Sequence, residues 1–178
     1  MSELPLILIQ NILERVDRNT SGIFSKVPEP IFALPPDVSD LVEDTVVHIS
    51  EFIIAKVQGK IGFNKGHPEI TPEILLSIPN TLCKPSKIYE DKRTLNRTKY
   101  LFICNIPLHQ IVVEIRRMET GKTEINTIFD MRNSELKRLE GKLPTIFSST
   151  GGAPTSSSSR SQRGRFSGVS TDKESVSE

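Results

Sequence analysis

The chain has 178 residues, 36% of them hydrophobic, and carries 23 lysines and arginines against 22 aspartates and glutamates. This length suits one domain with a hydrophobic core and is too short for two ordinary domains plus a long tail. The near-balanced charge excludes a basic field over the whole molecule, so any nucleic-acid interface has to arise from the local placement of charges.

Cysteine, histidine and apolar content exclude further classes of protein. Only Cys83 and Cys104 are present, and the three histidines are scattered, so neither a disulfide framework nor a four-ligand zinc pattern is predicted. We expect both thiols to be buried and free in a reducing compartment, and we expect no cofactor. No run approaches the roughly 18 apolar residues of a membrane span. The apolar start lacks the basic n-region of a signal peptide, so we predict a cytoplasmic protein.

The first fifth of the chain predicts one helix and one connector. Apolar residues recur at helical spacing over 4–18, namely Leu6, Ile9, Leu13 and Val16. We interpret the apolar side of this helix as packing on its own domain; docking of a partner is the alternative. Four prolines then predict an extended connector over 23–38: Pro28, Pro30, Pro35 and Pro36.

Further short elements follow the connector. A helical turn and a strand at 46–49 come first, and Ser50 is placed to cap a helix over 51–58. Thr71 is a predicted N-cap because Pro72, at the first helical position, has no backbone N–H to leave unpaired. We expect this second helix to cover 73–78 and to stop at Pro79.

The second half of the chain changes to the period of β-strands. Residues rich in β-branched and aromatic side chains predict strands over 88–90, 100–106, 111–117 and 123–129. A tight loop over 107–109 joins the middle two, and a last short helix is predicted over 133–140, with Ser134 as its cap. Helices first and strands afterwards predict an α+β fold with N-terminal helices on an antiparallel sheet of three to four strands.

These elements divide the chain into three parts. Residues 1–38 hold the first helix and the proline-rich connector, 39–147 form the main α+β domain, and 148–178 form a Ser/Gly-rich tail. Because the tail has almost nothing to bury, we predict that it is disordered. Its arginines in SRSQRGRF could hold RNA weakly. A solubilising end or a linker is the interpretation we favour.

No motif of high specificity is present, neither a Walker loop nor HExxH nor GxSxG. His67 follows Lys65 and Gly66 and precedes a proline, at the end of a loop that leads into a helix. A histidine there suits proton transfer because its ordinary pKa is about 6.5. An ordinary exposed loop histidine is the alternative.

Strand alternation places charges together on one face of the sheet. Over 111–117 it puts Val112, Glu114 and Arg116 on the face opposite Ile111, Val113 and Ile115. A carboxylate and a guanidinium two residues apart could act as a base and a phosphate clamp. A solvated ion pair is the plainer interpretation. On the last strand, the same period puts Thr127 towards the core with Ile125 and Phe129.

A basic stretch precedes the central strands. It carries Lys92, Arg93, Arg97 and Lys99, with Tyr89 and Tyr100 beside it. Cations bind phosphates and aromatic rings stack on bases, so this stretch is a candidate RNA-binding segment. The residues expected to bind substrate are Lys65, Arg93, Arg97, Lys99, Tyr100 and Arg116. A charged hairpin turn without function fits equally well.

An ordered set of short segments between Val46 and Phe129 resembles the phage-associated branch of the barnase–EndoU–colicin–RelE-like (BECR fold) nuclease superfamily. The segments are VVHIS, KGHPEI, ILLSIPNTLCKPSKIY, YLFICN, IVVEIR and EINTIFD. The resemblance implies a small metal-independent endoribonuclease of toxin or phage-effector type, with helices on one sheet face and RNA on the other. It implies attack of the ribose 2′-OH on the adjacent phosphate. A cognate immunity or antitoxin protein is implied as a partner.

The resemblance also assigns roles to individual residues. His67 would be an acid/base, Thr127 would hold a phosphate oxygen, and Arg97 and Lys99 would bind the RNA backbone. Glu114 comes from strand alternation and not from the family. The chain lacks an obvious second catalytic histidine, since His109 is predicted in a turn. This departure leaves a second function open, a non-catalytic module of the same fold that binds RNA or protein, or a phage structural component.

Overall fold

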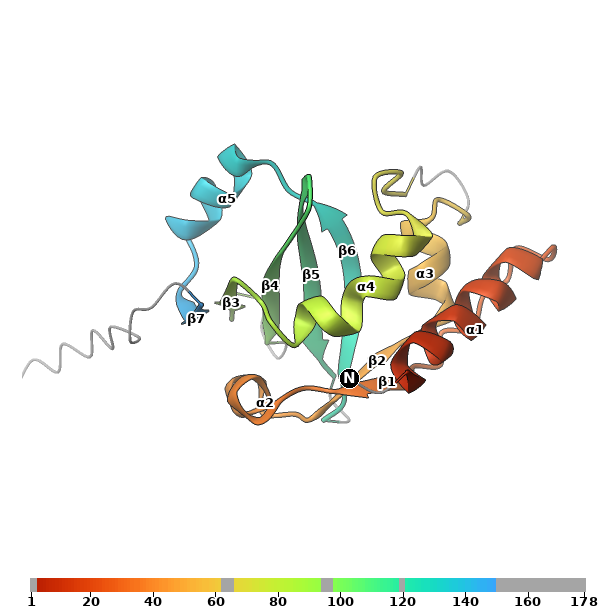
Figure 1. Cartoon of the computed structure of the whole chain (residues 1–178), viewed down its shortest axis with the longest axis horizontal. Helices are drawn as coiled ribbons and strands as arrows, with labels where there is room; N and C mark the ends of the chain where they lie inside the picture. The colour runs from red at the N-terminus through yellow and green to blue at the C-terminus, as the bar shows by residue number, and fades with distance from the viewer. Residues whose placement is uncertain (1–2, 62–65, 94–97, 119–120, 150–178) are drawn as a thin grey trace, which may run out of the picture.

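A single sheet runs through the protein, with strands in the order β1-β2-β6-β5-β4-β3-β7. The computed structural model describes residues 3–61, 66–93, 98–118 and 121–149, and these contain five helices and seven strands (Figure 1). The strands are β1 (Glu29–Ala33), β2 (Val46–Ile49), β3 (Lys87–Asp91), β4 (Lys99–Ile106), β5 (His109–Arg117), β6 (Thr123–Asp130) and β7 (Thr145–Ser148). The helices are α1 (Leu4–Arg18), α2 (Pro36–Val42), α3 (Glu51–Val57), α4 (Pro72–Leu82) and α5 (Asn133–Glu140). The predicted α+β class is confirmed.

The predicted number of strands and their all-antiparallel pairing are wrong. The sheet has seven strands rather than three or four, and β2 pairs with β6 in parallel, so the sheet is mixed. One unpredicted strand is β1, which lies inside the proline-rich segment expected to be only a connector. Pro30 is accommodated there because β1 is an edge strand with a shifted register beside it. The other is β7, at the opposite edge beside β3.

Three helices cover one face of the sheet. Figure 1 shows α4 lying across the sheet, with α3 and α1 beside it. The helix predicted over 4–18 is confirmed as α1, and its apolar side packs on its own domain, with Ile9, Ile12 and Val16 almost fully buried. The core beneath is built from inward-facing strand residues such as Phe102 and Val113, which have no exposed surface. Burial of this apolar face is the main favourable term in folding.

Helix α4 differs from its prediction at one end. Thr71 caps it as expected, since its hydroxyl accepts a hydrogen bond from the N–H of Ile74. The helix does not stop at Pro79 and continues to Leu82. Proline inside a helix costs about 3 kcal/mol. Here Ile78, Pro79 and Leu82 are buried, and this packing offsets the cost.

The opposite face of the sheet is divided into two halves. One half is apolar and carries a second cluster, in which Tyr89, Ile103 and Val112 pack with Leu136 and Leu139 of α5. The other half, towards the opposite end of β4, β5 and β6, is polar and is described below. Both cysteines are free, and Cys104 is buried under α4, where burial raises the pKa of its thiol to about 12.

Two predictions concern regions at the margins of the structure. The tail predicted to be disordered lies almost wholly in residues 150–178, outside the described residues, although Ser148 belongs to β7. No helix within the described ranges is long and apolar enough to cross a membrane.

Candidate functional site

Five adjacent strands each place one titratable residue at the same level on the polar half of the face. The registers pair Asp91 of β3 with Lys99 of β4, and Lys99 with Arg116 of β5. Arg116 pairs with Glu124 of β6, and Glu124 with His48 of β2. We call Asp91, Lys99, Arg116, Glu124 and His48 the ionic row. Directly opposed residues on a sheet lie about 4.5–5.5 Å apart at Cβ, so the row is a continuous line of titratable side chains.

The β3 end of the ionic row is held by an ion pair. The guanidinium of Arg93 donates to both oxygens of Asp91, at 2.8 and 2.7 Å. Arg93 therefore holds the pKa of the Asp91 carboxyl down at about 2, although burial of the carboxyl opposes the shift. Arg93 was predicted to bind substrate. In the structure its bidentate contact is made with Asp91.

A second carboxylate lies one step along β5. Glu114 accepts a hydrogen bond from the side-chain amide of Asn126 at 2.7 Å, and its oxygen lies 3.3 Å from the ammonium of Lys99. Its side chain is only 15% exposed. Charge-assisted contacts in such a half-buried place are stronger than the same contacts in water. The alternation that placed Glu114 and Arg116 opposite Ile111, Val113 and Ile115 is confirmed, because those three belong to the helix-covered core.

A β-bulge in β6 brings Thr127 to the polar face. Glu114 is paired with Thr127, whereas the next residue of β5, Ile115, is paired with Ile125. Asn126 is therefore the extra residue, and Asn126 and Thr127 together oppose Glu114. The prediction that Thr127 points to the core with Ile125 is wrong for this reason. A strict period of two cannot be carried across a bulge.

Glu124 is the carboxyl of the ionic row whose pKa is raised. Burial raises its pKa, while a hydrogen bond from Ser50 at 3.4 Å and the charges of Arg116 and His48 act in the opposite direction. Ser50 was predicted to cap α3, but it makes no capping hydrogen bond. Beside Glu124, the Nε of Arg116 is buried and has no hydrogen-bond partner within the described part of the chain. A carboxyl whose pKa is raised by burial thus lies beside a buried donor that has no partner among the described residues.

His67 lies next to Phe129 of β6. Gly66 turns the chain there with φ +64°, and a Cβ on it would lie 2.3 Å from the backbone nitrogen of Gly59, so only glycine fits. The N–H of His67 donates to Val57, which ties the loop to the end of α3. The imidazole lies 5.9 Å from the ring of Phe129. Phe129 is two residues, or about 7 Å, along β6 from Thr127.

The remaining predicted site residues are not brought together. Tyr100 is 3% exposed and belongs to the core under the helices, on the other face from its neighbour Lys99. It therefore cannot contact a ligand on the polar face. Lys65 and Arg97 lie outside the described residues, so their predicted roles stay predictions.

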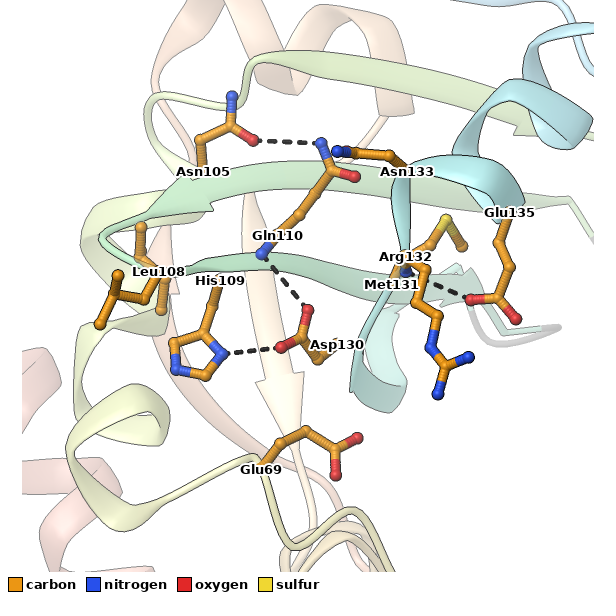
Figure 2. Close-up of a pocket in the computed structure, with 11 residues that line it drawn as sticks. Glu69, Asn105, Leu108, His109, Gln110, Asp130, Met131, Arg132, Asn133 and Glu135 are labelled. Carbon is orange, nitrogen blue, oxygen red and sulfur yellow. Dashed lines mark hydrogen bonds and ion pairs between the residues drawn. The ribbon is translucent and has the colours of Figure 1, made fainter.

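A separate cleft of about 1110 Å³ opens at the other end of β5 and β6 (Figure 2). His109, predicted in a turn, is the first residue of β5, and its Nδ1 lies 2.7 Å from a carboxylate oxygen of Asp130. The other oxygen of Asp130 accepts from the N–H of Gln110. His109 is seven residues from Arg116, or about 23 Å along the strand. It is therefore not part of the ionic row.

Several residues of the polar face were missed by sequence reasoning, namely His48, Asp91, Glu124 and Asn126. Glu124 and Asn126 could have been found from alternation in TEINTIFD, but His48 reaches the row only through the parallel β2–β6 pairing. Among the described residues, no cluster of three or more histidine, cysteine, aspartate or glutamate side chains could hold a metal ion. Compared with protein-family models, curated proteins and solved structures, the chain matches none.

Proposed function

We propose that the polar half of the sheet face binds RNA and cleaves it by transesterification through the ribose 2′-OH, as a metal-independent endoribonuclease. One observation carries this proposal. Glu114, which contacts Asn126 and Lys99, and Glu124, whose pKa is raised by burial, flank the cationic side chain of Arg116 on a half-buried surface. Pairs of carboxyl groups in different environments divide naturally into a base and an acid.

The proposed chemistry uses each group of this arrangement. Glu114 takes the proton of the 2′-OH, whose oxygen attacks the adjacent phosphorus. Arg116 and Lys99 stabilise the charge that develops on the phosphoryl oxygens. Glu124 donates a proton to the leaving 5′ oxygen as the P–O5′ bond breaks. The products are a 2′,3′-cyclic phosphate and a free 5′-OH. Diagonal neighbours on paired strands lie about 7–8 Å apart, which leaves room for one phosphate between the two carboxyls.

Thr127 and His67 extend this arrangement along β6. Thr127 opposes Glu114, and in the proposed mechanism its hydroxyl donates to a non-bridging phosphate oxygen. His67 contacts the ring of Phe129, the next residue but one after Thr127 on β6, and is a second candidate for the proton donor. The variants Glu124→Gln and His67→Ala separate the two, because only the loss of the true acid removes the limb of the pH–rate profile on which activity falls as pH rises.

The test is incubation of the purified protein with tRNA in excess EDTA. We expect cleavage that persists in EDTA and is lost in Arg116→Ala. A matched control is Arg132→Ala, which removes an exposed arginine from the separate cleft and should cleave like wild type. Intact RNA under all conditions, with the protein folded, would contradict the proposal.

Binding of RNA without cleavage is the second function, and one observation favours it. Lys99 and Arg116 are direct neighbours across β4 and β5, and two adjacent cations can hold a phosphate without any acid or base. This function predicts that the protein retains intact RNA in a gel-shift assay, and that Arg116→Ala weakens retention without any change in the length of the RNA.

A further inference from the structure

A small pocket opens beside the ionic row, between the start of α3 and the polar face of β5 and β6. Its volume is about 190 Å³. The side chains that matter for its chemistry are Lys26, Ser50, Phe52, Arg116, Glu124 and Asn126. Two of them, Arg116 and Glu124, belong to the ionic row, so a ligand in the pocket and a phosphate on the row would be adjacent.

The size of the pocket limits what it can take. Sites for whole small molecules usually measure about 300–1,000 Å³. A pocket of about 190 Å³ therefore takes a fragment of a larger ligand, such as one planar ring. The rest of that ligand would lie outside the pocket, along the row of charges.

The lining suits a flat, polar ring. Phe52 supplies an aromatic side chain, and the ammonium of Lys26 lies 5.0 Å from the centre of its ring. The buried Nε of Arg116 offers an N–H that finds no partner among the residues the structure describes. Asn126 uses its amide nitrogen on Glu114, which leaves its carbonyl oxygen as an acceptor. The pocket thus combines one apolar ring with hydrogen-bond donors and acceptors.

We propose that this pocket binds one nucleobase of the RNA and that it favours bases with an exocyclic amino group. The proposal rests on the proposed function, because it places the base next to the phosphate held by Arg116. Amide and carboxyl oxygens are the groups that accept from the amino groups of adenine and cytosine. Uracil has no amino group to donate to Asn126 or Glu124. Stacking on an aromatic side chain adds affinity for every base but does not discriminate between them.

The first experiment compares cleavage of poly(C), poly(A) and poly(U) in EDTA. We expect poly(C) or poly(A) to be cleaved at least about 10-fold faster than poly(U), which corresponds to about 1.4 kcal/mol. Equal rates on all three polymers, or fastest cleavage of poly(U), would overturn the base pocket and leave the proposed cleavage standing.

The second experiment measures binding alone, so that failure of cleavage and failure of the pocket are distinguishable. Uncleavable 2′-O-methyl oligomers of C and U are titrated against wild type and Phe52→Ala. We expect tighter binding of the C oligomer by wild type, and about 10-fold weaker binding of both oligomers by Phe52→Ala. Phe52→Trp should restore the affinity because it restores a ring. Binding of C and U with equal affinity by wild type contradicts the proposal, whether or not RNA is cleaved.

Discussion

The two faces of the central sheet are built from the same strands and differ in what their side chains do. Under α1, α3 and α4, Phe102, Val113 and Ile128 are completely buried in the larger apolar cluster. On the polar half of the other face, Glu114 and Arg116 come from the same strand as Val113 and lie half-buried among charges. One strand therefore contributes to stability through one set of alternate residues and carries the candidate chemistry on the other.

The difference shows that the polar face is not arranged for stability at every position. Glu124 loses solvation on folding, which raises its pKa, and the Nε of Arg116 is buried without a partner among the described residues. Each of these features costs free energy in the folded state. Local costs of this kind gather at functional sites, where the geometry of a reaction or a ligand requires them.

The largest expected effect is on activity, from the polar face. Glu114→Gln keeps the size of the side chain but removes the proposed base. We expect the rate of RNA cleavage to fall by about 10²–10⁴-fold, with a circular-dichroism spectrum like that of wild type. Unchanged cleavage in a folded Glu114→Gln variant would show that Glu114 is not the base.

An effect of similar size on stability is expected from the helix-covered face. Phe102 is 0% exposed, so Phe102→Ala should lower the free energy of unfolding by about 3–5 kcal/mol, measured by urea denaturation. The matched control is Leu108→Ala at the β4–β5 turn, where the leucine is fully exposed and the change should be within about 0.5 kcal/mol. Similar losses from both variants would contradict the described packing.

A smaller effect is expected at the β3 end of the ionic row. The pKa of Asp91 is lowered from 3.8 to about 2 in the folded protein, so its contribution to stability is present above pH 4 and is lost as pH falls through 2. Asp91→Asn should lower the free energy of unfolding by about 1–2 kcal/mol at pH 7, with allowance for the exposed partner Arg93. The difference from wild type should shrink below pH 4 and vanish below pH 2. A difference that is constant from pH 7 to pH 2 would exclude this linkage.

The smallest effect has the opposite sign. The pKa of Glu124 is raised above 4.5 in the folded protein, so ionisation costs the folded state stability once the pH exceeds the unfolded pKa. Glu124→Gln should therefore be more stable than wild type at pH 7 and equal to it at pH 3. A variant that is less stable at pH 7 would show that the carboxylate is well paired and is not a ready proton donor.

The sequence predicted well what depends on local pattern. The bounds of α1, the cap at Thr71 and the two faces of β5 follow directly from helical and strand periods. The features that escaped depend on pairing between distant segments. The prolines of residues 23–38 obscure the strand pattern of β1. Burial allows α4 to continue beyond Pro79. The bulge at Asn126 moves Thr127 to the opposite face of the sheet from the one predicted. The parallel pairing of β2 with β6 joins His48 to the ionic row across 76 residues of sequence, which no local pattern reveals.

The most direct test of the central claim is the chemistry of the RNA ends. An RNA oligomer is incubated with the protein in EDTA, and the same oligomer with 2′-O-methyl groups throughout is incubated in parallel. The masses of the products are measured by mass spectrometry. Attack by the 2′-OH predicts a 2′,3′-cyclic phosphate and a 5′-OH from the RNA oligomer, and no cleavage of the methylated one. Cleavage of the methylated oligomer, or an intact RNA oligomer, would contradict the assignment of the polar face as a ribonuclease site.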